Sequence, residues 1–110
     1  MIQQANDQNL EEILKNNENI IIKFQADWCG ICKAIAPEFE KIAEQNSENV
    51  SFFEINAPDN PKARMLAGVY SLPFFASFKN GELVEKMATS DKKKILSMIK
   101  EVESLNPELH

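Results

Sequence analysis

Residues 20–33 read IIIKFQADWCGICK, an almost continuous apolar run followed at once by both cysteines of the chain. Residues 20–26 are rich in β-branched side chains, which is typical of a β-strand covered on both faces. From about Gly30 to Gln45 the apolar residues recur at helical spacing instead. The stretch therefore predicts a buried strand that delivers Cys29 and Cys32 to the start of a helix.

On either side of this stretch, the turn-forming residues Gly, Pro and Asn divide the chain into short elements. We expect further helices at 7–16, 61–66 and 91–105, strands at 50–56, 74–78 and 83–87, and a short edge strand at 2–4. Asn6 or Asp7 is predicted to cap the first of these helices, and Asn60 the one that begins at Pro61. Asn80-Gly81 predicts a tight hairpin between the last two strands.

This order of elements predicts an α/β fold. Strands separated by helices pair in parallel through right-handed crossovers, and only the last hairpin has to be antiparallel. We therefore expect a mixed central sheet of four to five strands, flanked by about four helices. No linker, repeat or low-complexity tract interrupts the chain, so residues 1–110 are interpreted as a single domain.

Length and charge narrow the possible functions. A chain of 110 residues is long enough for one core, and its net charge of -5 argues against nucleic acid or an anionic membrane as partner. The N-terminus lacks a secretory signal, and no apolar run is long enough to span a bilayer. If Met1 is the native start, we expect a cytoplasmic monomer whose thiols are kept reduced. A leader peptide removed from upstream of Met1 would overturn this expectation about the compartment.

The two cysteines are spaced C-x-x-C at the predicted strand-to-helix junction. A helix N-terminus offers unpaired N–H groups and the positive end of the backbone dipole, both of which favour a thiolate over a thiol. We interpret Cys29 as the nucleophile. Cys32 lies one helical turn further on, within reach of the first sulfur, and is the natural resolving thiol.

Two other interpretations of the cysteine pair remain open at this point. C-x-x-C is also half of a zinc site, but zinc takes four ligands and the chain adds only His110, at its C-terminus, so we expect no metal. The cysteines would otherwise be two buried, unreactive side chains. That interpretation is weakened because the spacing, the position at a helix start and the flanking Trp28 coincide.

The sequence resembles the thioredoxin family from about Asn6 to Leu105. FQADWCGICKAIAPEFEKIA at 24–43 is similar to the family's active-site segment, including a proline inside the helix, here Pro37. YSLPFF at 70–75 is similar to its cis-proline segment, and FKNGE at 78–82 to its hairpin. The resemblance implies the thioredoxin fold, with a cis bond before Pro73 and that proline facing the cysteines.

The resemblance also implies a mechanism and partners. Cys29 attacks a disulfide in a client protein, and Cys32 then releases the reduced client, leaving the pair oxidised. A flavoprotein reductase that draws on NADPH regenerates the dithiol, so this chain holds no cofactor. The residues expected to bind or shape the substrate site are Trp28, Gly30, Ile31, Leu72 and Pro73, with Leu72 acting through its backbone.

Two features depart from the family pattern. Thioredoxins usually carry Gly-Pro between the cysteines, whereas Ile31 restores an N–H near the helix start, which predicts a less reducing couple. The family's buried Asp and its neighbouring Lys are replaced by Lys23 and Glu54, so the charges are exchanged. If the two side chains meet, Glu54 serves as the base and Lys23 offsets its charge; otherwise Lys23 extends to solvent and Glu54 lies on a wet face.

We therefore interpret the chain as a thioredoxin-like protein disulfide reductase, active in electron transport and cell redox homeostasis. Two alternatives stay open. One is an adaptor of the same fold that holds a partner without turnover, and the other is a more oxidising disulfide oxidase or isomerase.

Overall fold

The central strand of the fold is β2, Asn19–Gln25, which is paired on both edges. The structure, a computed structural model, describes residues 2–105. The other elements are, in chain order, β1 Ile2–Ala5, α1 Leu10–Asn16, α2 Gly30–Asn46, β3 Ser51–Asn56, the short 3-10 helix η1 Ala57–Asp59, α3 Pro61–Ala67, β4 Phe74–Lys79, β5 Glu82–Ala88 and α4 Lys92–Ser104. Every helix and strand expected from the sequence is present, and η1 is the one that was not expected.

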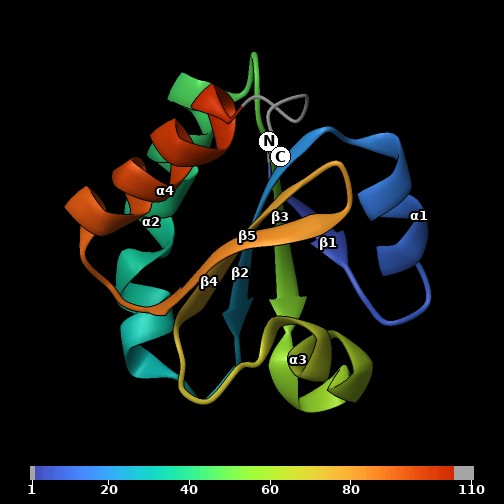
Figure 1. Ribbon diagram of the computed structural model, residues 1–110. Helices are drawn as coiled ribbons and strands as arrows, with labels where there is room; N and C mark the ends of the chain where they lie inside the picture. The colour runs from blue at the N-terminus through green and yellow to red at the C-terminus, as the bar shows by residue number, and fades with distance from the viewer. Residues whose placement is uncertain (1, 106–110) are drawn as a thin grey trace.

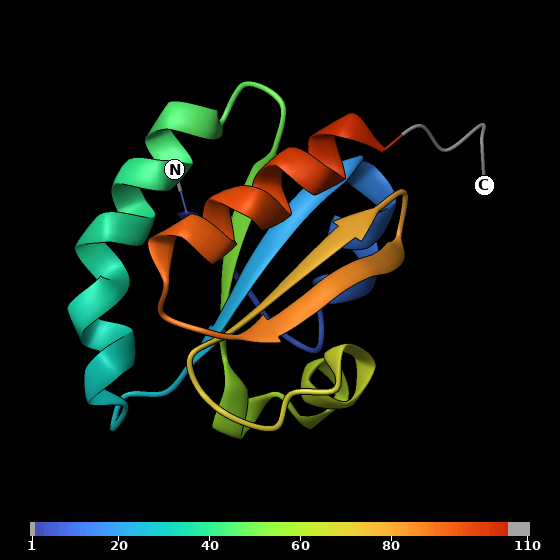
Figure 2. The ribbon, with the colours of Figure 1, turned by 60° about the vertical axis from the view of Figure 1, so that its left-hand side comes forward.

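The five strands form one mixed sheet in the order β1-β3-β2-β4-β5. β1, β3 and β2 run parallel, whereas β4 runs antiparallel to β2 and β5 antiparallel to β4. Figures 1 and 2 show α2 and α4 on one face of this sheet and α1 and α3 on the other. The predicted α/β class and the mixed sheet are therefore confirmed.

Residues of β2 alternate between two separate cores because successive side chains of a strand point to opposite faces. Ile20, Ile22 and Phe24 pack in the core under α1 and α3. Ile21 packs in the core under α2 and α4, and Lys23 lies on the same face. All five side chains are at most 1% exposed, so a charged group is buried in the middle of an apolar strand.

The hairpin between β4 and β5 turns at Asn80 and Gly81, as predicted. Their φ angles are 51° and 84°, and this pair of positive values is the one that the two-residue turn requires. Asn and Gly adopt the left-handed region most readily, which is why this dipeptide identifies the turn from sequence alone.

The predicted cap of the first helix is wrong. Helix α1 begins at Leu10 rather than residue 7, and its N-cap position is held by Asn9. The side-chain oxygen of Asn6 accepts hydrogen bonds from the backbone N–H groups of Gln8 and Asn9, both at 2.9 Å. These bonds close a local turn ahead of the helix, and such a turn competes with helix formation at Asn and Asp.

Asp7 instead caps the N-terminus of α3. Its two carboxylate oxygens accept from the backbone N–H groups of Ala63 at 2.8 Å and Lys62 at 3.1 Å. Asn60 occupies the N-cap position of α3, as predicted, but its side chain makes no cap bond there. Its side-chain oxygen accepts from the Asp7 N–H and its amide donates to the Asn56 carbonyl, each at 2.8 Å. The N-terminal segment is thereby fixed to α3.

We predict that Asp7→Ala lowers the free energy of unfolding by about 1 kcal/mol, the usual cost of losing a helix cap. Asp7→Asn keeps an acceptor at the same place and should retain most of the stability. Urea unfolding followed by circular dichroism measures both variants. Equal losses for the two substitutions would contradict a capping role.

Candidate active site

Cys29 is the N-cap residue of α2. Its backbone is extended, with φ -86° and ψ 102°, and its Sγ accepts a hydrogen bond from the Cys32 N–H at 3.1 Å. The backbone oxygen of Cys29 meanwhile accepts from the Lys33 N–H at 3.2 Å, which starts the helix. A sulfur takes the place that a Ser or Asp oxygen usually fills, so it satisfies one of the unpaired N–H groups of the first turn, that of Cys32.

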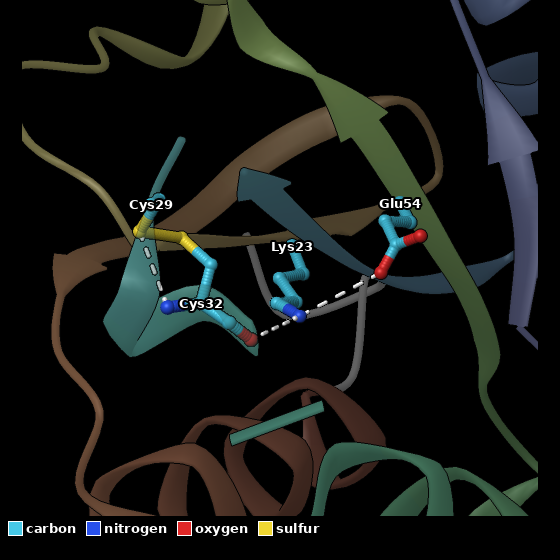
Figure 3. The surroundings of a disulfide bond; sticks show 4 residues. All are labelled: Lys23, Cys29, Cys32 and Glu54. Atoms are coloured by element: carbon cyan, nitrogen blue, oxygen red, sulfur yellow. Dashed lines mark hydrogen bonds and ion pairs between the residues drawn. A yellow bond between two sulfur atoms is a disulfide. The ribbon is translucent and has the colours of Figure 1, made fainter. Parts of the chain in front are cut away.

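Cys29 and Cys32 are joined by a disulfide bond, with 5.3 Å between their Cα atoms (Figure 3). Cys29 is 7% exposed and Cys32 only 1%. The first cysteine is therefore the more accessible of the two, as expected for a nucleophile followed by a resolving thiol. The donor to the Cys29 sulfur is the N–H of Cys32, however, and not the N–H that Ile31 contributes.

A segment distant in sequence packs over the cysteines. Ala26, Cys29 and Cys32 form a small buried cluster, against which the partly buried Leu72 packs. The Leu72–Pro73 peptide bond is cis, as the family resemblance implied. The Pro73 carbonyl accepts from the Thr89 N–H at 3.2 Å, which connects this segment to the end of β5.

A groove of about 580 Å³ lies beside the cysteines. It is lined by Trp28, Ala57, Pro58, Arg64, Val69, Tyr70, Ser71 and Leu72. Trp28 is 75% exposed and Tyr70 76%. Neither residue is buried in the core, so both aromatic side chains are open to solvent at the groove. Gly30 and Ile31 are also exposed, in the first turn of α2.

Arg64 and Tyr70 were not singled out from the sequence. Tyr70 lies two residues before Leu72 in the segment that carries the family resemblance, and this proximity is a signal that could have indicated it. Arg64 comes from α3, and no local pattern places that helix beside Trp28.

Lys23 is 0% exposed and lies between the active-site helix and β3. Its ammonium Nζ donates to the backbone oxygen of Cys32 at 3.2 Å and pairs with Glu54 Oε2 at 3.6 Å (Figure 3). The same nitrogen lies 5.8 Å from the centre of the Phe39 ring. Lys23 and Glu54 therefore do meet, and the alternative that Lys23 extends to solvent is wrong.

Strand register explains the meeting. Gln4, Glu54 and Lys23 stand opposite one another across β1, β3 and β2, on one face of the sheet. Gln4 donates its side-chain amide to Glu54 Oε1 at 2.9 Å, and Glu54 remains 17% exposed. The carboxylate is thus oriented by an edge-strand amide while still reaching water.

Burial lowers the pKa of Lys23 below its ordinary value, because a charged ammonium is costly to remove from water. The negative charge of Glu54 and its hydrogen bond oppose this effect but do not cancel it. Glu54 therefore offsets part of the cost of burying the charged form of Lys23.

Within residues 2–105, no group of three or more His, Cys, Asp or Glu side chains is placed to hold a metal ion. His110, which entered the zinc interpretation, lies outside that range. No helix in the same range is long and apolar enough to cross a membrane.

Comparison with known proteins gives consistent results. The thioredoxin family model matches residues 1–101. A thioredoxin of Rickettsia typhi is 35% identical over 89 residues, covering 80% of this chain and 85% of that protein. Thioredoxin-1 of Schizosaccharomyces pombe is 32% identical over 101 residues, covering 91% of this chain and 97% of its own.

Solved structures agree with the sequence relatives. The thioredoxin of Malassezia sympodialis superposes with a TM-score of 0.85 at 26% identity, covering 94% of each chain. The long form of thioredoxin f from spinach chloroplast gives a TM-score of 0.86 at 25% identity, covering 94% of this chain and 87% of that one.

A redox-active C-x-x-C disulfide at a helix N-terminus, in a chain with these relatives, defines a thiol-disulfide oxidoreductase. The chain belongs to the thioredoxin family.

We predict that Glu54→Gln lowers the free energy of unfolding at neutral pH by roughly 1 to 3 kcal/mol, because it leaves the Lys23 ammonium buried without an opposite charge. Since burial lowers the pKa of Lys23, the unfolded chain binds this proton more tightly than the folded chain. The loss should therefore shrink as the pH rises through the folded pKa towards that of a free lysine.

Urea unfolding of both proteins at neutral and alkaline pH measures this loss. Glu38→Gln is the matched control, because the Glu38–Lys92 pair is 44% and 55% exposed and should contribute little. A loss for Glu54→Gln that does not change with pH would show that the Lys23 charge is not its cause.

Proposed function

We propose that this protein reduces disulfide bonds in client proteins. The observation that carries the proposal is the position of Cys29, whose sulfur caps α2 and is the more exposed of the pair. In the reduced enzyme the helix N-terminus stabilises the Cys29 thiolate, which attacks one sulfur of the client disulfide. A bond forms between Cys29 and that sulfur, and the electron pair of the broken client bond leaves on the other client sulfur.

The second step returns the first client sulfur. Cys32, as a thiolate, attacks Cys29 in the mixed disulfide, so that the Cys29–Cys32 bond forms and the client thiolate leaves. The client gains two electrons and the cysteine pair loses two. The 5.3 Å separation of the two Cα atoms is within the range that a disulfide needs, so little backbone movement is required.

The proton of the Cys32 thiol is assigned to the Lys23–Glu54 pair. Lys23 contacts both Cys32 and Glu54, and Glu54 reaches water. In this step the Glu54 carboxylate, which reaches water, accepts the thiol proton through water, while Lys23 stays protonated throughout and offsets the charge of the carboxylate.

The groove beside the cysteines is proposed to hold the client. An exposed aromatic pair, Trp28 and Tyr70, offers a surface for apolar client side chains. Gly30 and Ile31 form the exposed rim next to Cys29. Leu72 packs beside the disulfide, and the proposal is that its backbone pairs with an extended client segment while Pro73 shapes the same side of the site.

The same proposal includes partners and location. A flavoprotein reductase similar to thioredoxin reductase, supplied by NADPH, would return the oxidised pair to the dithiol, since this reaction consumes the dithiol at each turnover. We propose that the chain works as one monomeric domain over residues 1–110, in the cytoplasm.

We predict that Cys32→Ser accumulates mixed disulfides with clients through Cys29, because the releasing thiol is missing. Capture from lysate followed by mass spectrometry identifies them, with Cys29→Ser as the matched control that should capture none. The wild-type protein should also catalyse insulin reduction by dithiothreitol. Absence of both capture and insulin reduction would favour the adaptor alternative.

We predict that Ile31→Pro makes the couple more reducing, because it removes one free N–H, with its partial positive charge, from the start of the helix that Cys29 caps. Equilibration with reduced and oxidised glutathione measures the equilibrium constant. This constant should change by about tenfold for each unit by which the substitution raises the pKa of the Cys29 thiol. A wild-type couple already as reducing as a typical thioredoxin would refute this explanation. A strongly oxidising wild type would favour the oxidase or isomerase.

A further inference from the structure

The resolving thiol has an unfavourable environment for its reactive form. Cys32 is 1% exposed and packs with Ala26 and Leu72, and burial among apolar groups disfavours a thiolate. Its own N–H is directed to the Cys29 sulfur, so the helix start stabilises the other cysteine. The reaction nevertheless requires a negative charge on Cys32.

The charged side chain in contact with Cys32 is a cation. Lys23 Nζ lies 3.2 Å from the Cys32 carbonyl oxygen, and Figure 3 shows the lysine between Cys32 and Glu54. From β3 the lysine meets Glu54, from α2 the backbone of Cys32 and the Phe39 ring, and from β4 its register partner is the apolar Phe75. In the described part of the chain, the titratable groups at this point are thus Lys23, Glu54 and the cysteines.

We propose that Lys23 is a charge-stabilising positioning residue for the resolving step: its buried ammonium holds the Cys32 segment by the backbone and favours the anionic form of the Cys32 sulfur. This inference rests on the proposed function, because it assigns a role within the same exchange reaction. It differs from proton transfer, since a cation stabilises the thiolate at equilibrium whichever group accepts the proton.

The exchanged charges have a consequence for the direction of exchange. An anion that is stabilised in the dithiol form, and has no counterpart in the disulfide, stabilises the reduced state and makes the couple a stronger oxidant. A buried carboxylate at the position of Lys23 would have the opposite effect on Cys32. The Lys23–Glu54 arrangement therefore acts in the direction predicted for Ile31, but on the other sulfur.

Titration of Cys32 alone tests the proposal. In a Cys29→Ser background, the thiolate absorbance of Cys32 is followed against pH with Lys23 intact and with Lys23→Met, which keeps the length of the side chain without its charge. We expect the midpoint to rise by about one pH unit or more in Lys23→Met, a tenfold loss of thiolate at neutral pH. Lys23→Arg, which retains the charge, should rescue it.

Glu54→Gln in the same background separates charge from proton transfer. While Lys23 stays charged, removal of the Glu54 charge leaves the site more positive, so the midpoint of Cys32 should not rise. In the protein that keeps both cysteines, Glu54→Gln should slow release of the mixed disulfide if Glu54 accepts the proton. A rise with Glu54→Gln equal to that with Lys23→Met would overturn the proposal. So would an unchanged midpoint in folded Lys23→Met.

A second measurement avoids dependence on the Cys29→Ser background. With both cysteines present, and at a pH above the Cys32 midpoint of both proteins, Lys23→Met should shift the glutathione equilibrium about tenfold towards the disulfide form of this protein. No shift, or a shift towards the dithiol, would contradict the inference. Both measurements need neither client nor reductase, so they can fail while insulin reduction succeeds, and insulin reduction can fail while they succeed.

Discussion

Pairing of β2 on both edges, with both of its faces covered, is the constraint on which the rest of the structure depends. The middle of a strand in that position has no access to water, so a charged side chain there needs a partner inside the protein. Lys23 is the one charged residue of this strand, and its partners are Glu54 and the backbone of Cys32. The core of the fold and the chemistry of the site therefore share a residue.

The residues of the active site also satisfy local structural requirements of the fold. Helix α2 needs an acceptor at its N-terminus, and Cys29 supplies a sulfur there. Leu72 covers the small cluster around the cysteines and so limits water at Cys32. The same contacts that satisfy the helix end and close the core also make the two sulfurs unequal, which is what a two-step exchange requires.

Local patterns identified the parts of the fold that depend on neighbouring residues. The buried strand, the C-x-x-C pair at a helix start and the turn at Asn80-Gly81 could be predicted because their causes lie within a few positions. The cap that Asp7 gives to α3 could not, because its partners lie more than fifty residues away. The Lys23–Glu54 pair could be predicted only in part. The two residue types indicated a possible ion pair, but the parallel register of β2 and β3 decides that the two side chains meet.

The position of β1 at the edge of the sheet, together with the bonds of Asp7, affects how the chain can fold as it is made. Strand β1 pairs with β3, and Asp7 with α3, and both of these elements are synthesised much later than β1. At about 5 to 20 residues per second, the N-terminal segment waits several seconds without a partner. The sheet edge beside Glu54, and with it the amide of Gln4, is thus among the later contacts available to the nascent chain.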